Sequence, residues 1–215
     1  MTTDQQAQSS ADVRLSAIAD YYGSKISTHG NNSRGVDWND ADQHQLRHEQ
    51  FLRLLRGQFE ATITDFGCGY GDFLTFLRAN GFVGRFLGHD ISQAMIDHAR
   101  HLHGEGQDRI WSSGPKPSDV SDYTIASGVL NVRCGASAES WKSHVDRTIE
   151  LLADSSRIGF GFNALTLWSD VDKRRADLHY EEPLERLAWC HDRFGRHVAC
   201  LHDYGLWEFT ILVRL

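Results

Sequence analysis

Residues 64–72 read Thr-Asp-Phe-Gly-Cys-Gly-Tyr-Gly-Asp, and this stretch decides the fold. A short run rich in β-branched residues, 61–66, leads into the three glycines, and the apolar spacing of residues 73–77 predicts a helix directly after them. A strand that opens into a glycine loop and then a helix brings bare backbone N–H groups up to an anionic group of a ligand. The stretch therefore predicts a ligand-binding loop inside an α/β domain.

Asp90 is the second part of this pattern. It lies nineteen residues past Gly71, at the end of the next predicted strand, residues 82–89. A carboxylate in this place can accept hydrogen bonds from both hydroxyls of a ribose. A lone glycine cluster is weak evidence, but a cluster between strand and helix, followed by an acid at the end of the next strand, strongly indicates a nucleoside site. We therefore predict that Gly67, Gly69 and Asp90 bind a nucleoside cofactor.

Two carboxylates flank the loop, Asp65 before it and Asp72 after it. They would lie poorly beside a doubly charged pyrophosphate, and the dinucleotide fingerprint requires a third glycine at the position of Asp72. They suit S-adenosylmethionine, whose amino-acid end carries an ammonium group and whose sulfur is cationic. Asp72 has an alternative interpretation as an N-terminal helix charge favoured by the dipole.

Three segments resemble the class I S-adenosylmethionine-dependent methyltransferases. Asp65–Gly71 (DFGCGYG) resembles their first motif, and Gly88–Ile96 (GHDISQAMI) resembles their second-strand motif and the helix that it opens. Asp122–Leu130 (DYTIASGVL) is similar to the fourth-strand segment that lines their cofactor cleft. The resemblance covers roughly residues 58–215, and its first two motifs are specific.

The resemblance implies roles for individual residues. Gly67 and Gly69 would lie against the methionine moiety, with Ser127 beneath it. Asp90 would bind the ribose, and Ile91 and Met95 would contact the adenine. The family often places an acid after the third strand to meet the adenine amino group, whereas this chain has Ser112 and Ser113, either of which would substitute. The predicted cofactor-binding set is Asp65, Gly67, Cys68, Gly69, Asp90, Ile91, Met95, Ser112, Ser113 and Ser127.

Strands alternate with helices from residue 61 onward, which predicts a parallel sheet with helices on both faces. The last two predicted strands, 197–202 and 207–213, are separated by only four residues, too few for a parallel crossover, so they must run antiparallel. The predicted fold of residues 58–215 is a Rossmann-like three-layer α/β sandwich. Its seven-stranded sheet is mostly parallel and its last strand is antiparallel, as in the family.

The residues before 58 are predicted to form a helical lid. We expect a disordered tail over 1–12, a helix over 13–26 that ends around Gly23, and a second helix that stops at Gly57. The connecting segment gathers aromatic and hydrogen-bonding side chains. We interpret residues 13–57 as a lid that positions the substrate and excludes water. The alternative is a helical pair that merely packs on the sheet, with Trp38 as its anchor.

Ligands of open α/β sheets lie outside the carboxyl ends of the strands, so the acceptor is expected there and under the lid. Methyl transfer is an in-line displacement, and the protein mainly holds the nucleophile and the methyl group in line. A hydroxyl acceptor would gain from a general base, for which His29 and His202 are the catalytic candidates. The predicted substrate-binding residues are Tyr21, Tyr22, Arg34, Trp38, Asn131, Asn163 and Tyr204.

His44 and His48 lie one helical turn apart and could in principle ligate a metal. No third ligand is evident nearby in the sequence, so we predict a solvated face and no metal. His98, His101 and His103 are expected on the surface. The basic run Lys173–Arg175 is expected to be solvated, although it could meet an anionic group of a substrate.

Composition narrows the class of acceptor. The chain has 22 basic and 29 acidic residues and a formal net charge of -7, which argues against nucleic-acid and anionic-membrane partners. The Asn/Asp-Pro-Pro-aromatic motif of many nucleic-acid methyltransferases is absent at Ser127–Leu130. We expect methyl transfer to an O, N or C nucleophile of a small molecule, from secondary or sugar and glycan metabolism. The alternatives are a non-catalytic S-adenosylmethionine-binding partner or regulatory module and, third, an NAD-dependent oxidoreductase.

The four cysteines are scattered without a C-x-x-C pair, which makes a disulfide framework unexpected and excludes a zinc ribbon. The first twelve residues lack the features of a signal peptide. The most apolar stretch, 158–168, has eleven residues, far fewer than the roughly 18 that span a bilayer. We therefore expect a cytoplasmic protein. The sequence leaves its oligomeric state open, a homodimer being one option.

Overall fold

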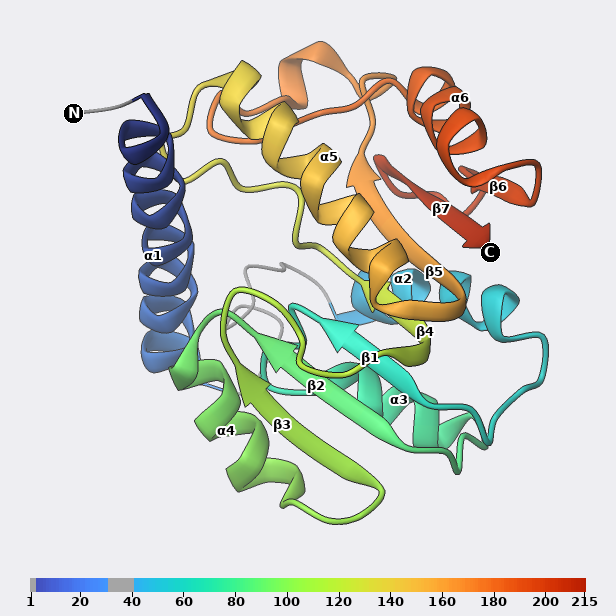
Figure 1. The fold of residues 1–215 in the computed structure, drawn as a ribbon. Coiled ribbons are helices and arrows are strands. Elements are labelled where there is room, and N and C mark those ends of the chain that lie inside the picture. The colour runs from blue at the N-terminus through green and yellow to red at the C-terminus, as the bar shows by residue number, and fades with distance from the viewer. Residues whose placement is uncertain (1–2, 31–40) are drawn as a thin grey trace.

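The computed structural model describes residues 3–30 and 41–215 of the chain. Seven strands form one sheet in the order β3-β2-β1-β4-β5-β7-β6 (Figure 1). Neighbouring strands pair in parallel except at β7, which runs antiparallel to both β5 and β6. This confirms the predicted sheet. The strands are β1 Ile63–Phe66, β2 Phe86–Asp90, β3 Arg109–Ser113, β4 Ser121–Ala126, β5 Ser156–Leu165, β6 Val198–Leu201 and β7 Glu208–Arg214.

Helices cover both faces of the sheet, which confirms the three-layer arrangement. One face carries α2 (Ala41–Leu55), α3 (Asp72–Ala79) and α4 (Gln93–His103), whose apolar side chains share one buried cluster with the strands. The other face carries α5 (Ala138–Asp154) and α6 (Pro183–Phe194), which bury a second cluster. Each helix presents one apolar stripe to the sheet, as its 3.6-residue periodicity requires. Among the described residues, no helix has the length and apolarity needed to cross a bilayer.

The N-terminal helix α1 (Thr3–His29) is longer than predicted. It includes residues 3–12, where we expected a disordered tail, and it continues through Gly23, where we expected it to end. A Cβ at Gly23 would lie 3.5 Å from the Ser92 hydroxyl, at the start of α4. Glycine is thus accommodated inside the helix at a point where α1 passes close to α4.

The two helices of the predicted lid occupy different places relative to the sheet. Figure 1 shows α1 standing at one side of the sheet, between α4 and α5, whereas α2 lies behind the strands. The apolar side chains of α2, Phe51, Leu54 and Leu55, are buried against the sheet. Helix α2 therefore belongs to one of the packed layers, and the lid role of α1 stays a prediction. The proposed anchor Trp38 lies outside the described residues.

The connection from β3 to β4 opens a space above the sheet. Residues 114–120 cross between the two parallel strands as a loop without a helix. Such crossovers usually take a dozen or more residues and contain a helix that covers the sheet. Here the ends of β1 and β2 are flanked instead by α1 and α5, with a cavity between them. Gly114 and Pro115, at the start of this short crossover, line that cavity.

Packing of α5 is expected to make a large contribution to stability. The Ile149 side chain is fully buried between α5 and the sheet, so Ile149→Ala should lower the free energy of unfolding by about 2–5 kcal/mol through lost burial and a residual cavity. Urea unfolding followed by circular dichroism measures this change. Leu184→Ala on α6, where the side chain is 60% exposed, is the control and should change it by less than about 0.5 kcal/mol. Equal effects of the two variants would contradict the assigned packing.

Candidate functional site

The glycine loop is held over the end of β2 by backbone hydrogen bonds. The N–H groups of Gly67 and Cys68 donate to the His89 carbonyl at 2.7 and 3.0 Å. Gly69 N–H donates to Asp90 Oδ2 at 2.9 Å, and Ser92 N–H donates to Asp90 Oδ1 at 2.8 Å. The φ angles of Gly67 and Gly69 are 78° and 54°, in the left-handed region that glycine adopts without strain. These contacts place the loop and Asp90 side by side, as predicted.

The carboxylates of Asp72 and Asp90 give the loop a negative potential. Burial raises the pKa of Asp90 to about 6, against the opposing effect of its two N–H donors. Burial also raises the pKa of Asp65, with further contributions from the charges of Asp90 and Asp72. Placing another anion here would be unfavourable, whereas a cationic ligand would be stabilised. The electrostatics therefore favour a sulfonium and ammonium ligand over a pyrophosphate.

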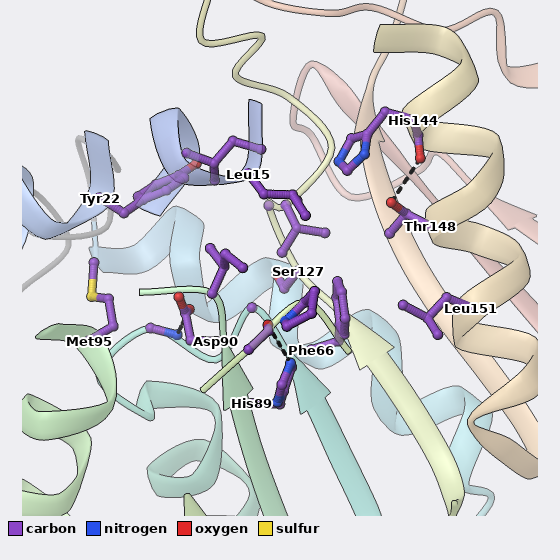
Figure 2. A pocket seen from close by; sticks show the side chains of 18 of the residues that line it. Leu15, Tyr22, Phe66, His89, Asp90, Met95, Ser127, His144, Thr148 and Leu151 are labelled. Atoms are coloured by element: carbon purple, nitrogen blue, oxygen red, sulfur yellow. Dashed lines mark hydrogen bonds between the residues drawn. The ribbon is translucent and has the colours of Figure 1, made fainter. Parts of the chain in front are cut away.

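A cavity of about 270 Å³ lies between α1, α5 and the ends of β1, β2 and β4 (Figure 2). In Figure 2, Leu15 and Tyr22 reach it from α1, Met95 from α4, and His144 and Leu151 from α5. Six of the predicted cofactor-binding residues line it together: Gly67, Gly69, Asp90, Ile91, Met95 and Ser127. The structure thus brings together most of the residues that the first two motifs implied.

Several lining residues of this cavity were not predicted. Phe66 and His89, at the ends of β1 and β2, have stacked rings with centroids 5.7 Å apart. Their place at the carboxyl ends of predicted strands was a signal that could have identified them. The α5 side chains had no such signal, because they lie beside the apolar face that defined the helix. The other unpredicted lining residues are Leu15, Ile18, Gly114, Pro115, Gly128, Val129, His144, Arg147, Thr148 and Leu151.

Ser112, Ser113 and Cys68 do not line this cavity. The Ser112 hydroxyl lies 3.0 Å from His89 Nδ1, and the Ser113 hydroxyl is hydrogen-bonded to Gln93. Gly114 and Pro115, just after β3, line the cavity instead, so the chain meets it one or two residues later than predicted. The Cys68 side chain is buried in the core beneath the loop.

A smaller cavity of about 40 Å³ lies on the other side of the glycine loop. It shares Gly67, Gly69 and Ser127 with the larger cavity, and Asp65 and Cys68 also line it. The two cavities are therefore neighbours separated only by the loop residues. This is where the resemblance places the methionine moiety.

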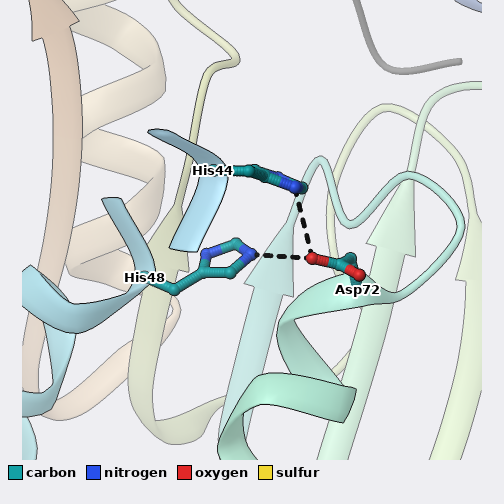
Figure 3. Close-up of side chains that lie close together, drawn as sticks. All are labelled: His44, His48 and Asp72. Carbon is teal, nitrogen blue, oxygen red and sulfur yellow. Dashed lines mark ion pairs between the residues drawn. The ribbon is translucent and has the colours of Figure 1, made fainter. Parts of the chain in front are cut away.

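His44 and His48 both point toward Asp72 (Figure 3), and all three side chains line the smaller cavity. His44 Nδ1 and His48 Nε2 lie 3.2 and 3.4 Å from Asp72 Oδ2. The predicted solvated face is wrong, because this side of α2 packs against the start of α3 and buries both imidazoles. The ring of His48 also lies against Phe73, with centroids 4.8 Å apart.

Burial and mutual contacts perturb this cluster. Burial lowers the pKa of His48 to about 4, which keeps its imidazole neutral at physiological pH. Burial alone would raise the pKa of Asp72, but hydrogen bonds from His44 and His48 hold it well below its usual range. The ligand atoms of the three side chains lie within 4.8 Å of one another. Imidazoles and carboxylates are zinc ligands, so Asp72 is the third potential ligand that sequence spacing did not reveal.

A third cavity, of about 240 Å³, lies beyond the ends of β4 and β5. Of the predicted substrate-binding residues, Tyr22 and Asn131 line it, and the Asn131 Oδ1 accepts a hydrogen bond from Leu165 N–H at 3.3 Å. Lys173 and Arg175 line it as well, so two members of the predicted solvated run border a cavity. We call this the acceptor-side cavity. Its remaining lining residues are Gln43, Arg47, Gly128, Val132, Leu165, Ser169, Leu178, Tyr180 and Trp207.

Three candidates lie away from all three cavities. Asn163 is fully buried, accepts a hydrogen bond from Gly128 N–H at 2.7 Å and donates one to Glu208 at 3.2 Å, so it supports the loop after β4 rather than a ligand. The Tyr204 hydroxyl lies 3.0 Å from that of Thr210. His202 follows the edge strand β6 and contacts the ring of Trp168. The sheet order separates His202 from the glycine loop, which argues against a catalytic role.

The remaining candidates are only partly placed. Tyr21 packs edge-on against Tyr22, with centroids 5.2 Å apart, and does not line a cavity. His29 is the last residue of α1, and its side chain, like Arg34 and Trp38, lies outside the described residues. His103 was expected on the surface, but its Nε2 lies 3.1 Å from the Tyr70 carbonyl and its ring stacks on Trp111.

Known proteins resemble the chain in sequence and in fold. It is 40% identical over 164 residues to the Mycobacterium tuberculosis protein named "Putative methyltransferase Rv1506c", covering 76% of this chain and 98% of that protein. The magnesium protoporphyrin IX methyltransferase (ChlM) of Synechocystis PCC 6803 with bound SAH superposes with a TM-score of 0.68 at 14% identity, over 93% of this chain and 98% of that one. The structure described as the DhpI-SAM-HEP complex superposes with a TM-score of 0.65 at 13% identity, over 94% of this chain and 98% of that one. No family model matches the chain.

The sheet order with its antiparallel β7, the glycine loop after β1 and the acid ending β2 define the class I methyltransferase fold. The sequence relative, which is named a methyltransferase, aligns with this chain over 98% of its own length. The chain belongs to the class I S-adenosylmethionine-dependent methyltransferases.

Substitution of Gly67 tests whether the glycine loop binds the cofactor. A Cβ at this position would lie 2.1 Å from Val129 Cγ1, on a backbone with φ 78°, so Gly67→Ala must displace the loop or Val129, both of which line the large cavity. We expect S-adenosylmethionine affinity to fall at least about tenfold, measured by calorimetry. Gly57→Ala is a matched control, because φ is 79° there and nothing lies within 4 Å of the added Cβ. An equal loss of affinity in both variants would show that backbone strain, not the loop, is responsible.

Proposed function

We propose that this methyltransferase transfers the methyl group of S-adenosylmethionine to a small-molecule acceptor that binds in the acceptor-side cavity. The observation that carries the proposal is the junction of the cavities. Gly128 and Tyr22 line both the large cavity and the acceptor-side cavity, whereas Gly67, Gly69 and Ser127 join the large cavity to the smaller one. A cofactor extended along the glycine loop would lie within reach of an acceptor on the far side of Gly128.

The cofactor would follow the line of these residues. Asp90 would accept hydrogen bonds from the ribose hydroxyls, while Ile91 and Met95 would pack against the adenine. The methionine end would lie against Gly67 and Gly69, where the negative potential from Asp72 and Asp90 would favour its ammonium group. The negative potential of the loop would stabilise this cationic cofactor, whereas it would repel the negatively charged pyrophosphate of a dinucleotide.

The size and surroundings of the acceptor-side cavity favour a small molecule. Its volume is about 240 Å³, and it is bordered by α1, α2 and the segments after β4 and β5. The net charge of -7 disfavours a polynucleotide, whose binding depends on cationic contacts to phosphates. One structural neighbour is named for its action on magnesium protoporphyrin IX, itself a small molecule.

The chemistry requires positioning above all. A lone pair of the acceptor forms a bond to the methyl carbon, the C–S bond breaks, and its electron pair passes to sulfur to give S-adenosylhomocysteine. The protein lowers the barrier by holding nucleophile and methyl in line and by excluding water. Helix α1 contributes Tyr22 to both cavities, which suits the proposed lid role.

Cofactor affinity should depend on pH through Asp90. Its pKa of about 6 means that the carboxylate which accepts the ribose hydrogen bonds is lost as the pH falls below 6. At pH 5, one unit below this pKa, only about a tenth of the Asp90 side chains are ionised. We therefore expect calorimetry to show that S-adenosylmethionine binds about tenfold more weakly at pH 5 than at pH 8. Asp90→Asn should bind weakly at both values with little pH dependence. Equal wild-type affinities at the two pH values would contradict the role of Asp90.

Turnover separates an enzyme from a non-catalytic binding module. We expect the protein to bind S-adenosylmethionine but not NAD in calorimetry, and to release S-adenosylhomocysteine when supplied with a panel of small hydroxyl, amine and acid acceptors. Asp90→Ala should abolish both signals at the same cofactor concentration. Binding without release of S-adenosylhomocysteine for any acceptor would favour the regulatory module, and tighter binding of NAD would overturn the cofactor assignment.

A further inference from the structure

We infer that His44, His48 and Asp72 bind a Zn²⁺ ion beside the glycine loop, and that the free coordination position of this ion takes the carboxylate of S-adenosylmethionine. The metal site itself depends only on the three side chains and on the helices that carry them. The contact with the carboxylate rests on the proposed function, which places the methionine end in the smaller cavity.

The three ligands come from two rigid helices. His44 and His48 are four residues apart on α2 and both point toward Asp72, the first residue of α3 (Figure 3). Two histidines with this spacing on one face of a helix are a common zinc-binding arrangement. Phe51 of α2 and Phe73 of α3 belong to the same buried cluster, which fixes the two helices against each other. The ligands are therefore held in place by packing.

The spacing of the ligand atoms fits tetrahedral coordination. His44 Nδ1 and His48 Nε2 lie 3.2 and 3.4 Å from Asp72 Oδ2, and the three atoms all lie within 4.8 Å of one another. In a tetrahedral site with bonds of about 2.0–2.1 Å, neighbouring ligand atoms are about 3.3–3.4 Å apart. Two of the separations are already close to this value, and rotation of the imidazole rings brings the two nitrogens toward it.

The states of the two imidazoles suit ligation. The His48 side chain is only 4% exposed, and neither of its ring nitrogens has a well-aligned hydrogen-bond partner among the described residues. Such a buried nitrogen is unfavourable, and an ion that takes the lone pair of Nε2 would satisfy it. His44 also has a further interaction, which is compatible with ligation through Nδ1 because a ligating imidazole usually holds a hydrogen bond with its other nitrogen.

The charges around the site favour a cation. The carboxylates of Asp72 and Asp90 give the glycine loop a negative potential, and Asp72 lies within the site itself. Two neutral imidazoles and one carboxylate compensate only half of the charge of a divalent ion. The bound ion therefore keeps one positive charge, which attracts a further anionic oxygen.

The fourth coordination position opens into the smaller cavity. All three ligands line this cavity of about 40 Å³, so an ion held between them is accessible from it. Zinc with three protein ligands takes water or another small ligand in its fourth position. Gly67 and Gly69, against which the methionine end would lie, line the same cavity. A carboxylate oxygen of the cofactor would replace the water, and the ammonium group would stay beside the negative loop.

Cobalt binding tests the metal site without any cofactor. The protein is stripped of metal with a chelator and titrated with Co²⁺, whose visible absorption is intense only in tetrahedral coordination. We expect one tetrahedral Co²⁺ per chain, displaced by Zn²⁺, which such sites bind more tightly. A spectrum without tetrahedral coordination would overturn the inference. So would a thiolate-to-cobalt charge-transfer band, because it would place the ion on a cysteine.

Variants assign the ion to the three ligands. Asp72→Asn and His44→Gln each remove one ligand with little change in size, and should weaken zinc binding at least about tenfold in calorimetry. His191→Gln is the matched control: His191 lies 3.2 Å from Asp192, but both side chains are more than half exposed and neither lines a cavity described above. Circular dichroism checks the folding of each variant, and the cobalt spectrum of the unaltered protein does not depend on it. Unchanged zinc affinity in both ligand variants, or an equal loss in His191→Gln, would contradict the site.

Decarboxylated S-adenosylmethionine tests the contact between the ion and the cofactor. We expect zinc to raise the affinity for S-adenosylmethionine about tenfold in calorimetry, and to leave the affinity for the decarboxylated compound unchanged. Equal effects of zinc on the two compounds would overturn the contact with the carboxylate. Failure to bind S-adenosylmethionine both with and without zinc would instead overturn the proposed function, whereas the cobalt spectrum decides the metal site in either case.

Discussion

The buried carboxylate of Asp90 is the constraint on which the site depends. It accepts one N–H from the glycine loop, through Gly69, and one from the start of α4, through Ser92. Three elements, the end of β2, the loop after β1 and the N-terminus of α4, are thereby joined at one charged group. Because burial makes that charge costly, the two donors are needed to maintain it, and the loop geometry follows from them.

A second buried network, beside the acceptor-side cavity, also joins several elements at one carboxylate. Glu208 on β7 is held between Arg47 of α2 and Asn163 of β5, and Asn163 in turn holds the loop after β4 through Gly128. A charged pair inside the protein is stable only when its remaining polar atoms are also satisfied. The antiparallel strand β7, which distinguishes this sheet, thus carries the group that fixes one wall of the acceptor-side cavity.

Local patterns predicted the sheet, the glycine loop and Asp90, because each depends on residues close together in the chain: alternating strands and helices, a loop with positive φ, an acid at a strand end. Long-range packing decided the rest. His44 and His48 looked solvated because Asp72 belongs to another helix, and Asn163 looked like a ligand-binding residue because its partners, Gly128 and Glu208, lie 35 and 45 positions away. The prediction that α1 ends at Gly23 was wrong, because the glycine lies inside the helix where α1 passes close to α4.

The sequence by itself determined the class of fold and the geometry of the glycine loop, since a strand, three glycines and a following acid leave few backbone arrangements open. Only the tertiary structure decided which side chains line the acceptor-side cavity. Arg47, Lys173 and Arg175 come from separate elements, and no spacing along the chain shows that they share a cavity. The physical reason is that backbone geometry follows from local sterics and hydrogen bonds, whereas a binding surface is assembled from residues that meet only when the layers pack.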